Sequence, residues 1–111
     1  MSGRELLIGA VGEVPDGEAV LVPANETGTG AAIAVFNDGG SFYAIDDTCT
    51  HGAASLAEGW AEDGRVECPL HGGAFCLRTG EAVALPASAG VLAHRVDVRD
   101  GQVWLTPTAV E

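Results

Sequence analysis

The sequence predicts an all-β protein, and three observations carry that prediction. Apolar residues gather in short runs rich in valine, isoleucine and aromatic side chains, not at the 3.6-residue spacing of an amphipathic helix. Sixteen glycines and five prolines in 111 residues supply many tight turns. Turn signals separate consecutive apolar runs. We therefore expect an antiparallel β-sandwich or barrel and no long helix.

Five runs are predicted strands, and they span residues 18–22, 31–36, 41–45, 93–98 and 102–106. The stretch 37–40, Asn-Asp-Gly-Gly, joins the second run to the third, and Asp100-Gly101 joins the last two, so both connections are predicted hairpins. Gly28-Thr29-Gly30 is a predicted turn or loop. It lacks the strand-to-helix context of a phosphate-binding loop.

The chain is short enough for a single domain, 1–111, in which a bound metal would contribute appreciably to folding. Between about residues 47 and 81 the composition changes, and we expect a small metal-binding subdomain inserted into the β body. Turns at Gly59-Trp60 and Asp63-Gly64 are expected within it.

Two short motifs inside that subdomain carry the chemistry. Cys49-Thr50-His51 is followed by Cys68-Pro69-Leu70-His71, which gives the pattern C-x-H-x16-C-x2-H. Two thiolates and two imidazoles can hold one tetrahedral zinc ion, or a [2Fe-2S] cluster in which histidine replaces cysteine on one iron. Each motif has one ligand of each kind, as a dinuclear cluster needs if each loop serves both irons. The pattern favours the cluster, and a structural zinc module is the alternative.

Residues beyond the ligands extend the pattern to a known family. The stretches Cys49 to Gly52, Cys68 to Phe75 and Thr79 to Glu81 closely resemble the Rieske ferredoxins of bacterial aromatic-ring dioxygenases, such as those acting on biphenyl, naphthalene and carbazole. The resemblance is specific from about Asp46 to Pro86. It implies one Rieske [2Fe-2S] cluster per chain, with Cys49 and Cys68 on the buried iron and His51 and His71 on the outer one. Further residues expected around the cluster are Gly52, Leu70, Gly72, Gly73, Phe75 and Pro86.

The resemblance also implies a low reduction potential. Respiratory Rieske proteins carry an extra cysteine in each ligand loop, forming a disulfide, where this chain has Ala54 and Leu70. They place a serine and a tyrosine, whose hydroxyls bond the cluster sulfurs, where this chain has Gly73 and Phe75. Losing two such donors would lower the potential by something on the order of 100 mV, towards the low end of the Rieske range of about −150 to +300 mV. A low potential favours electron delivery to an oxygenase over quinol oxidation.

The expected function is therefore one-electron transfer without a catalytic site. The resemblance implies two partners, an NAD(P)H-dependent flavoprotein reductase and a terminal Rieske oxygenase, for a carrier that is monomeric in isolation. A ring-hydroxylating oxygenase also needs a mononuclear iron held by two histidines and a carboxylate. After His51 and His71 only His94 remains, so this chain cannot build that site. A Rieske-like small subunit of a nitrite reductase stays an alternative.

The charge is strongly acidic. Sixteen Asp and Glu residues oppose five arginines, there is no lysine, and the formal net charge is −11. Such a surface excludes nucleic-acid binding and attracts a protein with a basic patch, although the charge could also serve solubility alone. The carboxylates between the ligand loops are the expected steering groups, namely Glu58, Glu62, Asp63 and Glu67.

The sequence also suggests a cytoplasmic location. The residues before and within the brief apolar run 6–11 lack the pattern of a signal peptide, and the longest charge-free stretch, 82–94, is too short to cross a bilayer. With two of three cysteines committed to metal, Cys76 has no intramolecular partner, which suits a reducing compartment.

Other residues have ordinary interpretations. His94 is expected to be a surface or strand histidine, and Cys76 a small buried apolar residue. Trp60 and Trp104 are expected to pack in the core or against loops, with a docking surface as the alternative for Trp60. Leu56 and Leu70 either shield the cluster or simply pack, and Pro86 lies in a covering loop or a turn.

Overall fold

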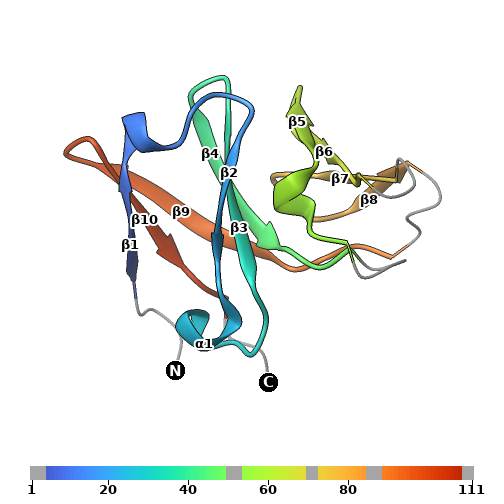
Figure 1. Cartoon of the computed structure of the whole chain (residues 1–111), viewed down its shortest axis with the longest axis horizontal. Coiled ribbons are helices and arrows are strands. Elements are labelled where there is room, and N and C mark those ends of the chain that lie inside the picture. The colour runs from blue at the N-terminus through green and yellow to red at the C-terminus, as the bar shows by residue number, and fades with distance from the viewer. Residues whose placement is uncertain (1–4, 50–53, 70–72, 85–88, 109–111) are drawn as a thin grey trace.

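The computed structural model describes residues 5–49, 54–69, 73–84 and 89–108, and within them the protein is all-β as predicted. Two antiparallel sheets lie beside each other, a larger one that curves into a nearly closed barrel and a smaller one at its side (Figure 1). Within the described ranges, no helix is long and apolar enough to cross a membrane.

The larger sheet contains six strands in the order β1-β10-β9-β4-β3-β2. Their bounds are β1 Leu6–Ala10, β2 Ala19–Val22, β3 Ile33–Asp38, β4 Ser41–Asp46, β9 Ala93–Arg99 and β10 Gln102–Thr106. A 3-10 helix, η1 Val11–Glu13, follows β1, and the short helix α1 Ala24–Thr27 follows β2.

The smaller sheet contains four strands in the order β5-β6-β7-β8. Their bounds are β5 Trp60–Glu62, β6 Arg65–Glu67, β7 Ala74–Cys76 and β8 Ala82–Ala84, and the 3-10 helix η2 Leu56–Glu58 precedes β5. The sheet is attached to the barrel through its first turn, where the Gly64 amide donates to Oδ2 of Asp38 at 2.5 Å.

Strand β3 divides the interior into two cores. Ile33 and Val35 point into the barrel, whereas Ala34 and Phe36 point towards the smaller sheet. All four are buried because successive residues of a strand face opposite sides, and here both sides are covered. The continuous apolar run of this strand follows from that position.

The smaller sheet is an excursion from the larger one. The chain leaves at the end of β4 and returns at the start of β9, and these two strands are neighbours, with Ala44 opposite His94 and Ile45 opposite Ala93. The Asp46 amide donates to the carbonyl of Leu92 at 2.9 Å, so the two ends of the excursion are hydrogen-bonded to each other. The limits 47 and 81 expected for a cluster-binding subdomain stay a prediction.

The five predicted strands are confirmed with end shifts of up to two residues, and both predicted hairpins are present. Asp100 and Gly101 adopt φ values of 52° and 74°, and Asp63 and Gly64 adopt 55° and 79°, as two-residue hairpin turns require. The turn expected at Gly59-Trp60 is wrong, because Trp60 begins β5.

Candidate metal centre

The two motif cysteines lie at the ends of strands and are buried together. Cys49 follows β4 at 2% exposure and Cys68 directly follows β6 at 1%. Both belong to the core between the two sheets, together with Leu56 and Phe75. Strands from both sheets thus bring the two sulfur ligands expected on the buried iron into one apolar region.

The predicted ligands His51 and His71 lie outside the described residues, as do Gly52, Leu70, Gly72 and Pro86. Within the described ranges, no three His, Cys, Asp or Glu side chains are grouped so that they could hold a metal ion. A four-ligand centre built on Cys49 and Cys68 therefore needs donors from other parts of the chain, and the sequence places its two motif histidines there.

The two ligand loops are closed in the same way. The Cys49 amide donates to the carbonyl of Ala54 at 3.0 Å, and the Cys68 amide donates to the carbonyl of Gly73 at 2.6 Å. Each bond joins a cysteine to the residue five positions later. The shared closure holds the ends of each loop together and gives both cysteines the same position at the start of a loop.

Asp47 holds the first of these loops in place through three hydrogen bonds to the residues that follow it. Its buried Oδ1 accepts from Ser55 Oγ at 2.9 Å and from the Ala57 amide at 2.8 Å, while its own carbonyl accepts from the Leu56 amide at 2.8 Å. The carboxylate therefore accepts a hydrogen bond from a backbone N–H at the start of η2 that has no partner within the helix. It also links the residues before the loop to those after it. Nothing in the sequence distinguishes Asp47 for this role, because it is one of many acidic residues.

Gly59 brings the two loops near each other. A Cβ at this position would collide with the backbone carbonyl of Glu67, the residue before Cys68. A glycine is needed here for close approach. The segment that follows the first ligand loop can therefore lie directly against the strand that leads to the second.

The surroundings of the sulfurs fit an iron–sulfur cluster. Leu56, Val66 and Phe75 are 0% exposed and Leu77 is 1% exposed, so the wall is apolar. Net charge is costly to bury in such a region. Two ferric ions, two sulfides and two thiolates sum to zero charge, and neutral histidines add none, so the oxidised cluster avoids that cost.

Gly73 and Phe75, the two positions expected to influence the reduction potential, contribute no hydroxyl group. Phe75 is fully buried on β7 opposite Val66, and Gly73 is buried at the closure of the second loop. Leu56, expected to shield the cluster or to pack, is 0% exposed in the same core as both cysteines, which is consistent with either role.

Four other expectations have mixed outcomes. His94 is a strand histidine, but it is buried rather than on the surface. Cys76 is only half-buried, and its pKa is lowered chiefly by a hydrogen bond from the Thr79 side chain. Trp104 is half-buried, as expected for a packing residue. Packing is the wrong interpretation for Trp60, which is 63% exposed.

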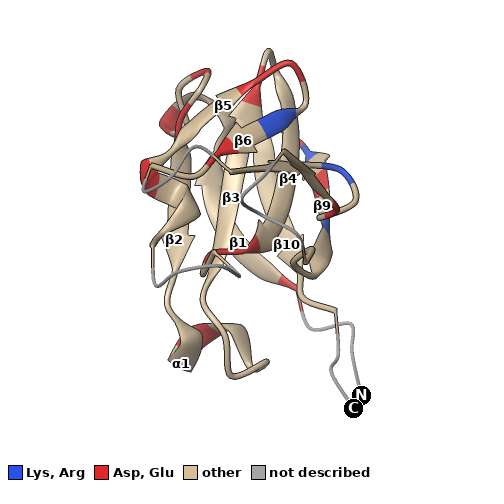
Figure 2. Ribbon diagram, turned by 90° about the vertical axis from the view of Figure 1, so that its right-hand side faces the viewer, with Lys and Arg blue, Asp and Glu red and all other residues tan. Residues whose placement is uncertain are grey.

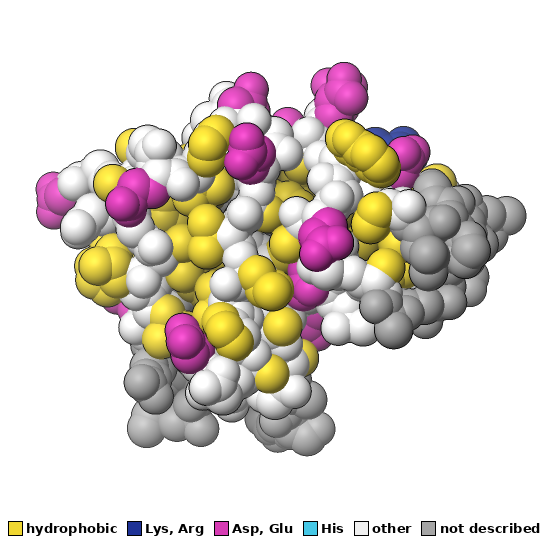
Figure 3. Space-filling view, viewed as in Figure 1, with side chains coloured by type: hydrophobic (Ala, Val, Ile, Leu, Met, Phe, Trp, Pro, Cys, Tyr) yellow, Lys and Arg dark blue, Asp and Glu magenta, His cyan; other side chains and the backbone are white. Residues whose placement is uncertain are grey.

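The four expected steering carboxylates are all exposed, on η2, on the β5–β6 hairpin and at its turn. Acidic residues also occur on the larger sheet and on α1 (Figure 2). The face in Figure 3 carries many acidic side chains and little basic surface.

Comparison with known proteins agrees with an all-β fold that holds an iron–sulfur cluster. Residues 4–103 match the model of the Rieske [2Fe-2S] domain, and the chain belongs to that family. It is 47% identical over 96 residues, 86% of each chain, to the 3-phenylpropionate/cinnamic acid dioxygenase ferredoxin subunit of Escherichia coli K12.

Among solved structures, a chain of the complex of reduced oxygenase and oxidized ferredoxin in carbazole 1,9a-dioxygenase superposes with a TM-score of 0.84. It is 37% identical, and the match covers 96% of this chain and 97% of that one. A nitrite reductase small subunit from Mycobacterium tuberculosis superposes with a TM-score of 0.80 at 22% identity, covering 96% and 97%, which shows a shared fold only.

Proposed function

We propose that this chain is the one-electron carrier of a multicomponent aromatic-ring dioxygenase. It takes electrons from an NAD(P)H-dependent flavoprotein reductase and passes them to the terminal oxygenase, without a catalytic site of its own. The observation that carries the proposal is the 47% identity, over 86% of both chains, to a dioxygenase ferredoxin subunit. We also propose that the protein is monomeric in isolation and works in the cytoplasm.

The proposed ligands are Cys49, His51, Cys68 and His71. When bound, the cluster supplies one reversible electron at a low potential. The chain's own contribution begins with the core around Cys49 and Cys68, which excludes water from the sulfur side. The matched loop closures and Asp47 fix the positions of the cysteines. Electron exchange is proposed at the side of His51 and His71, because these two residues would ligate the outer iron.

Reconstitution tests the proposal. The purified, iron-loaded chain would be combined with the reductase and terminal oxygenase of the Escherichia coli 3-phenylpropionate/cinnamic acid dioxygenase, with NADH and 3-phenylpropionate. We expect dihydroxylated product to form only when the chain is present. The matched control is Cys49→Ser, which should form no product above background.

Absence of product with the wild-type chain, combined with stimulation of an NADH-dependent nitrite reductase large subunit, would favour the nitrite reductase alternative. A colourless protein with one zinc ion would instead support the structural zinc module. Success in the dioxygenase assay would exclude both, because neither supplies electrons to an oxygenase.

A further inference from the structure

Trp60 lies in an unusual position for the largest type of apolar side chain. It begins β5, the edge strand of the smaller sheet, and it is 63% exposed. It is directly opposite Glu67 on β6, which immediately precedes Cys68. An exposed tryptophan this close to a proposed cluster ligand suggests contact with another molecule, because aromatic residues are enriched at interfaces.

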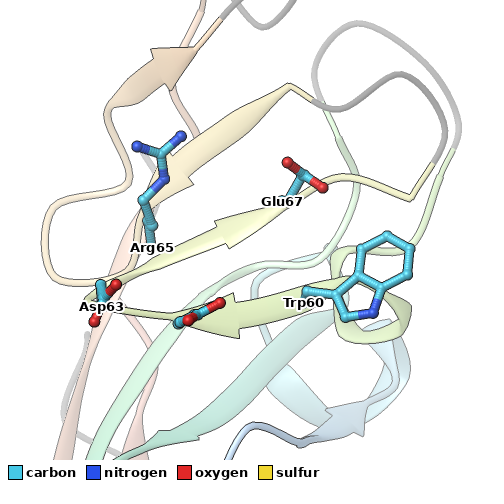
Figure 4. Close-up of a pocket in the computed structure, with 5 residues that line it drawn as sticks. Trp60, Asp63, Arg65 and Glu67 are labelled. Carbon is cyan, nitrogen blue, oxygen red and sulfur yellow. The ribbon is translucent and has the colours of Figure 1, made fainter.

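The outer face of the β5–β6 hairpin surrounds this tryptophan with negative charge. The register pairs Trp60 with Glu67 and Glu62 with Arg65, so these four side chains share the outer face, while buried Val66 points inward. Together with Asp63 they line a groove of about 340 Å³. Figure 4 shows Trp60 at one end of the hairpin, Asp63 and Arg65 at the other, and Glu67 on the neighbouring strand.

The carboxylates of this face are available for an external partner. Glu62, Asp63 and Glu67 form no ion pair with any residue that the structure describes. The described cation–π contact of the chain involves Trp104, not Trp60. Three carboxylates and one guanidinium leave the face with a net negative charge, which complements a basic protein surface.

The other tryptophan shows what such a face can bind. The guanidinium of Arg99 lies 5.1 Å from the ring centroid of Trp104, and its Nη2 donates to Oε1 of Glu5 at 2.8 Å. One arginine is thus held by an aromatic ring and a carboxylate together. Trp60 and Glu67 present the same pair of groups on adjacent strands, without an arginine from the described part of this chain.

We propose that Trp60 and Glu67 form a receptor for an arginine side chain on the surface of the terminal oxygenase. The guanidinium stacks on the indole and donates to the Glu67 carboxylate, and Glu62 and Asp63 favour its approach. Arginine fits this site better than lysine because its planar group can stack and donate at the same time. The contact rests on the proposed function, and it would hold the partner beside the loop that begins at Cys68.

Steady-state kinetics in the reconstituted dioxygenase separate docking from electron transfer. Trp60→Ala is expected to raise the KM for the carrier about fivefold, and Glu67→Gln about threefold, with kcat and the reduction potential unchanged. Trp60→Phe, which keeps an aromatic face, should recover most of the affinity. The matched controls are Leu21→Ala on β2, which removes an exposed apolar residue, and Glu26→Gln on α1, which removes an exposed carboxylate.

The proposal is overturned if Trp60→Ala changes KM no more than Leu21→Ala, or if only the KM measured with the reductase changes. A binding assay keeps the proposal testable if the wild-type carrier supports no turnover. Calorimetry with a hexa-arginine peptide should give tighter binding than with hexa-lysine, and Trp60→Ala should remove that preference. Equal binding of the two peptides by the wild-type chain would contradict the arginine receptor whatever the carrier's partners are.

Discussion

His94 on β9 and Asp46 on β4 are joined side chain to side chain, with His94 Nε2 2.8 Å from Asp46 Oδ1. The Thr108 amide donates to His94 Nδ1 at 2.8 Å, so Nδ1 is an acceptor and the ring proton is on Nε2. The His94 side chain is 0% exposed, and both of its ring nitrogens have hydrogen-bond partners inside the protein. The pair connects the strand where the chain leaves the barrel to the strand where it returns.

Removal of Asp46 should therefore destabilise the fold. Asp46→Ala leaves the buried imidazole N–H without its acceptor, which costs about 1–3 kcal/mol and lowers Tm by roughly 5–15 °C. Thermal unfolding of the iron-loaded protein measures this. Asp97→Ala is the matched control, because Asp97 pairs with the exposed Arg95 and such surface pairs contribute about 0–1 kcal/mol. Equal Tm values for the two variants would contradict a structural role for the buried pair.

Asp47 should control how firmly the first ligand loop holds its metal. Asp47→Ala removes the acceptor for Ser55 Oγ and the Ala57 amide, and we expect a chelator to extract iron about tenfold faster, as about 1.4 kcal/mol of lost stabilisation would allow. Glu58→Ala, at an exposed position of the same η2 helix, is the control. If both variants release iron at the wild-type rate, the anchor is not important for metal retention.

The ligand assignment predicts a sharp difference among the cysteines. Cys49→Ser and Cys68→Ser should abolish the Rieske spectrum, as should His51→Ala and His71→Ala, because each removes a proposed ligand. Cys76→Ser should retain two irons per chain and an anisotropic reduced spin-resonance spectrum of low average g. Iron and sulfide analysis with spin resonance measures both outcomes. An unchanged spectrum in any of the four ligand variants would remove that residue from the site.

The absence of hydroxyl donors at Gly73 and Phe75 should account for a low potential. In Gly73→Ser/Phe75→Tyr each new hydroxyl can donate to a sulfur that is more negative after reduction, and we expect the potential to rise by about 100 mV. Voltammetry of the intact protein measures the change. The single variant Phe75→Tyr should give part of the rise. No rise with an intact cluster would reject the hydrogen-bond explanation.

The thiol of Cys76 should ionise at lower pH than an ordinary cysteine. A hydrogen bond from the Thr79 side chain is the main cause of its lowered pKa, and it outweighs the opposing effect of burial. The rate of alkylation by iodoacetamide should therefore rise at a lower pH than in Thr79→Val, where the hydroxyl is lost, while Thr79→Ser should behave as the wild type. Identical pH profiles for wild type and Thr79→Val would contradict this assignment.

The limits of sequence-based prediction here have physical causes. The barrel strand β3 was predictable because both of its faces are buried, which gives a continuous apolar run. Strand β1 was missed because its pairing with β10 shifts register between Leu7 and Gly9, which disturbs the alternation. Strands β5 to β8 have three residues each, too few to establish a period.

Features that depend on contacts between residues far apart in the sequence could not be predicted either. The Asp46–His94 bond spans 48 residues and exists only because β4 and β9 are adjacent in the sheet. Composition gave no means to distinguish Asp47 from the surface carboxylates, or the exposed Trp60 from a core tryptophan. The ligand motifs, by contrast, were readable because their chemistry is local, and their assignment to Cys49, His51, Cys68 and His71 stays a prediction.

The hydrogen bond between the Asp46 amide and the Leu92 carbonyl has a consequence for protein engineering. Because the smaller sheet begins and ends at two hydrogen-bonded residues, where β4 ends and just before β9 begins, both ends of segment 47–91 can join one pair of adjacent antiparallel strands. Any β-barrel with such a pair offers the same two ends. The host must also supply a buried apolar face in place of Ala34 and Phe36. The segment could therefore be inserted into an unrelated host to transfer the electron-transfer centre. The host's paired strands already hold the two insertion points together, which lowers the entropic cost of closing the inserted loop.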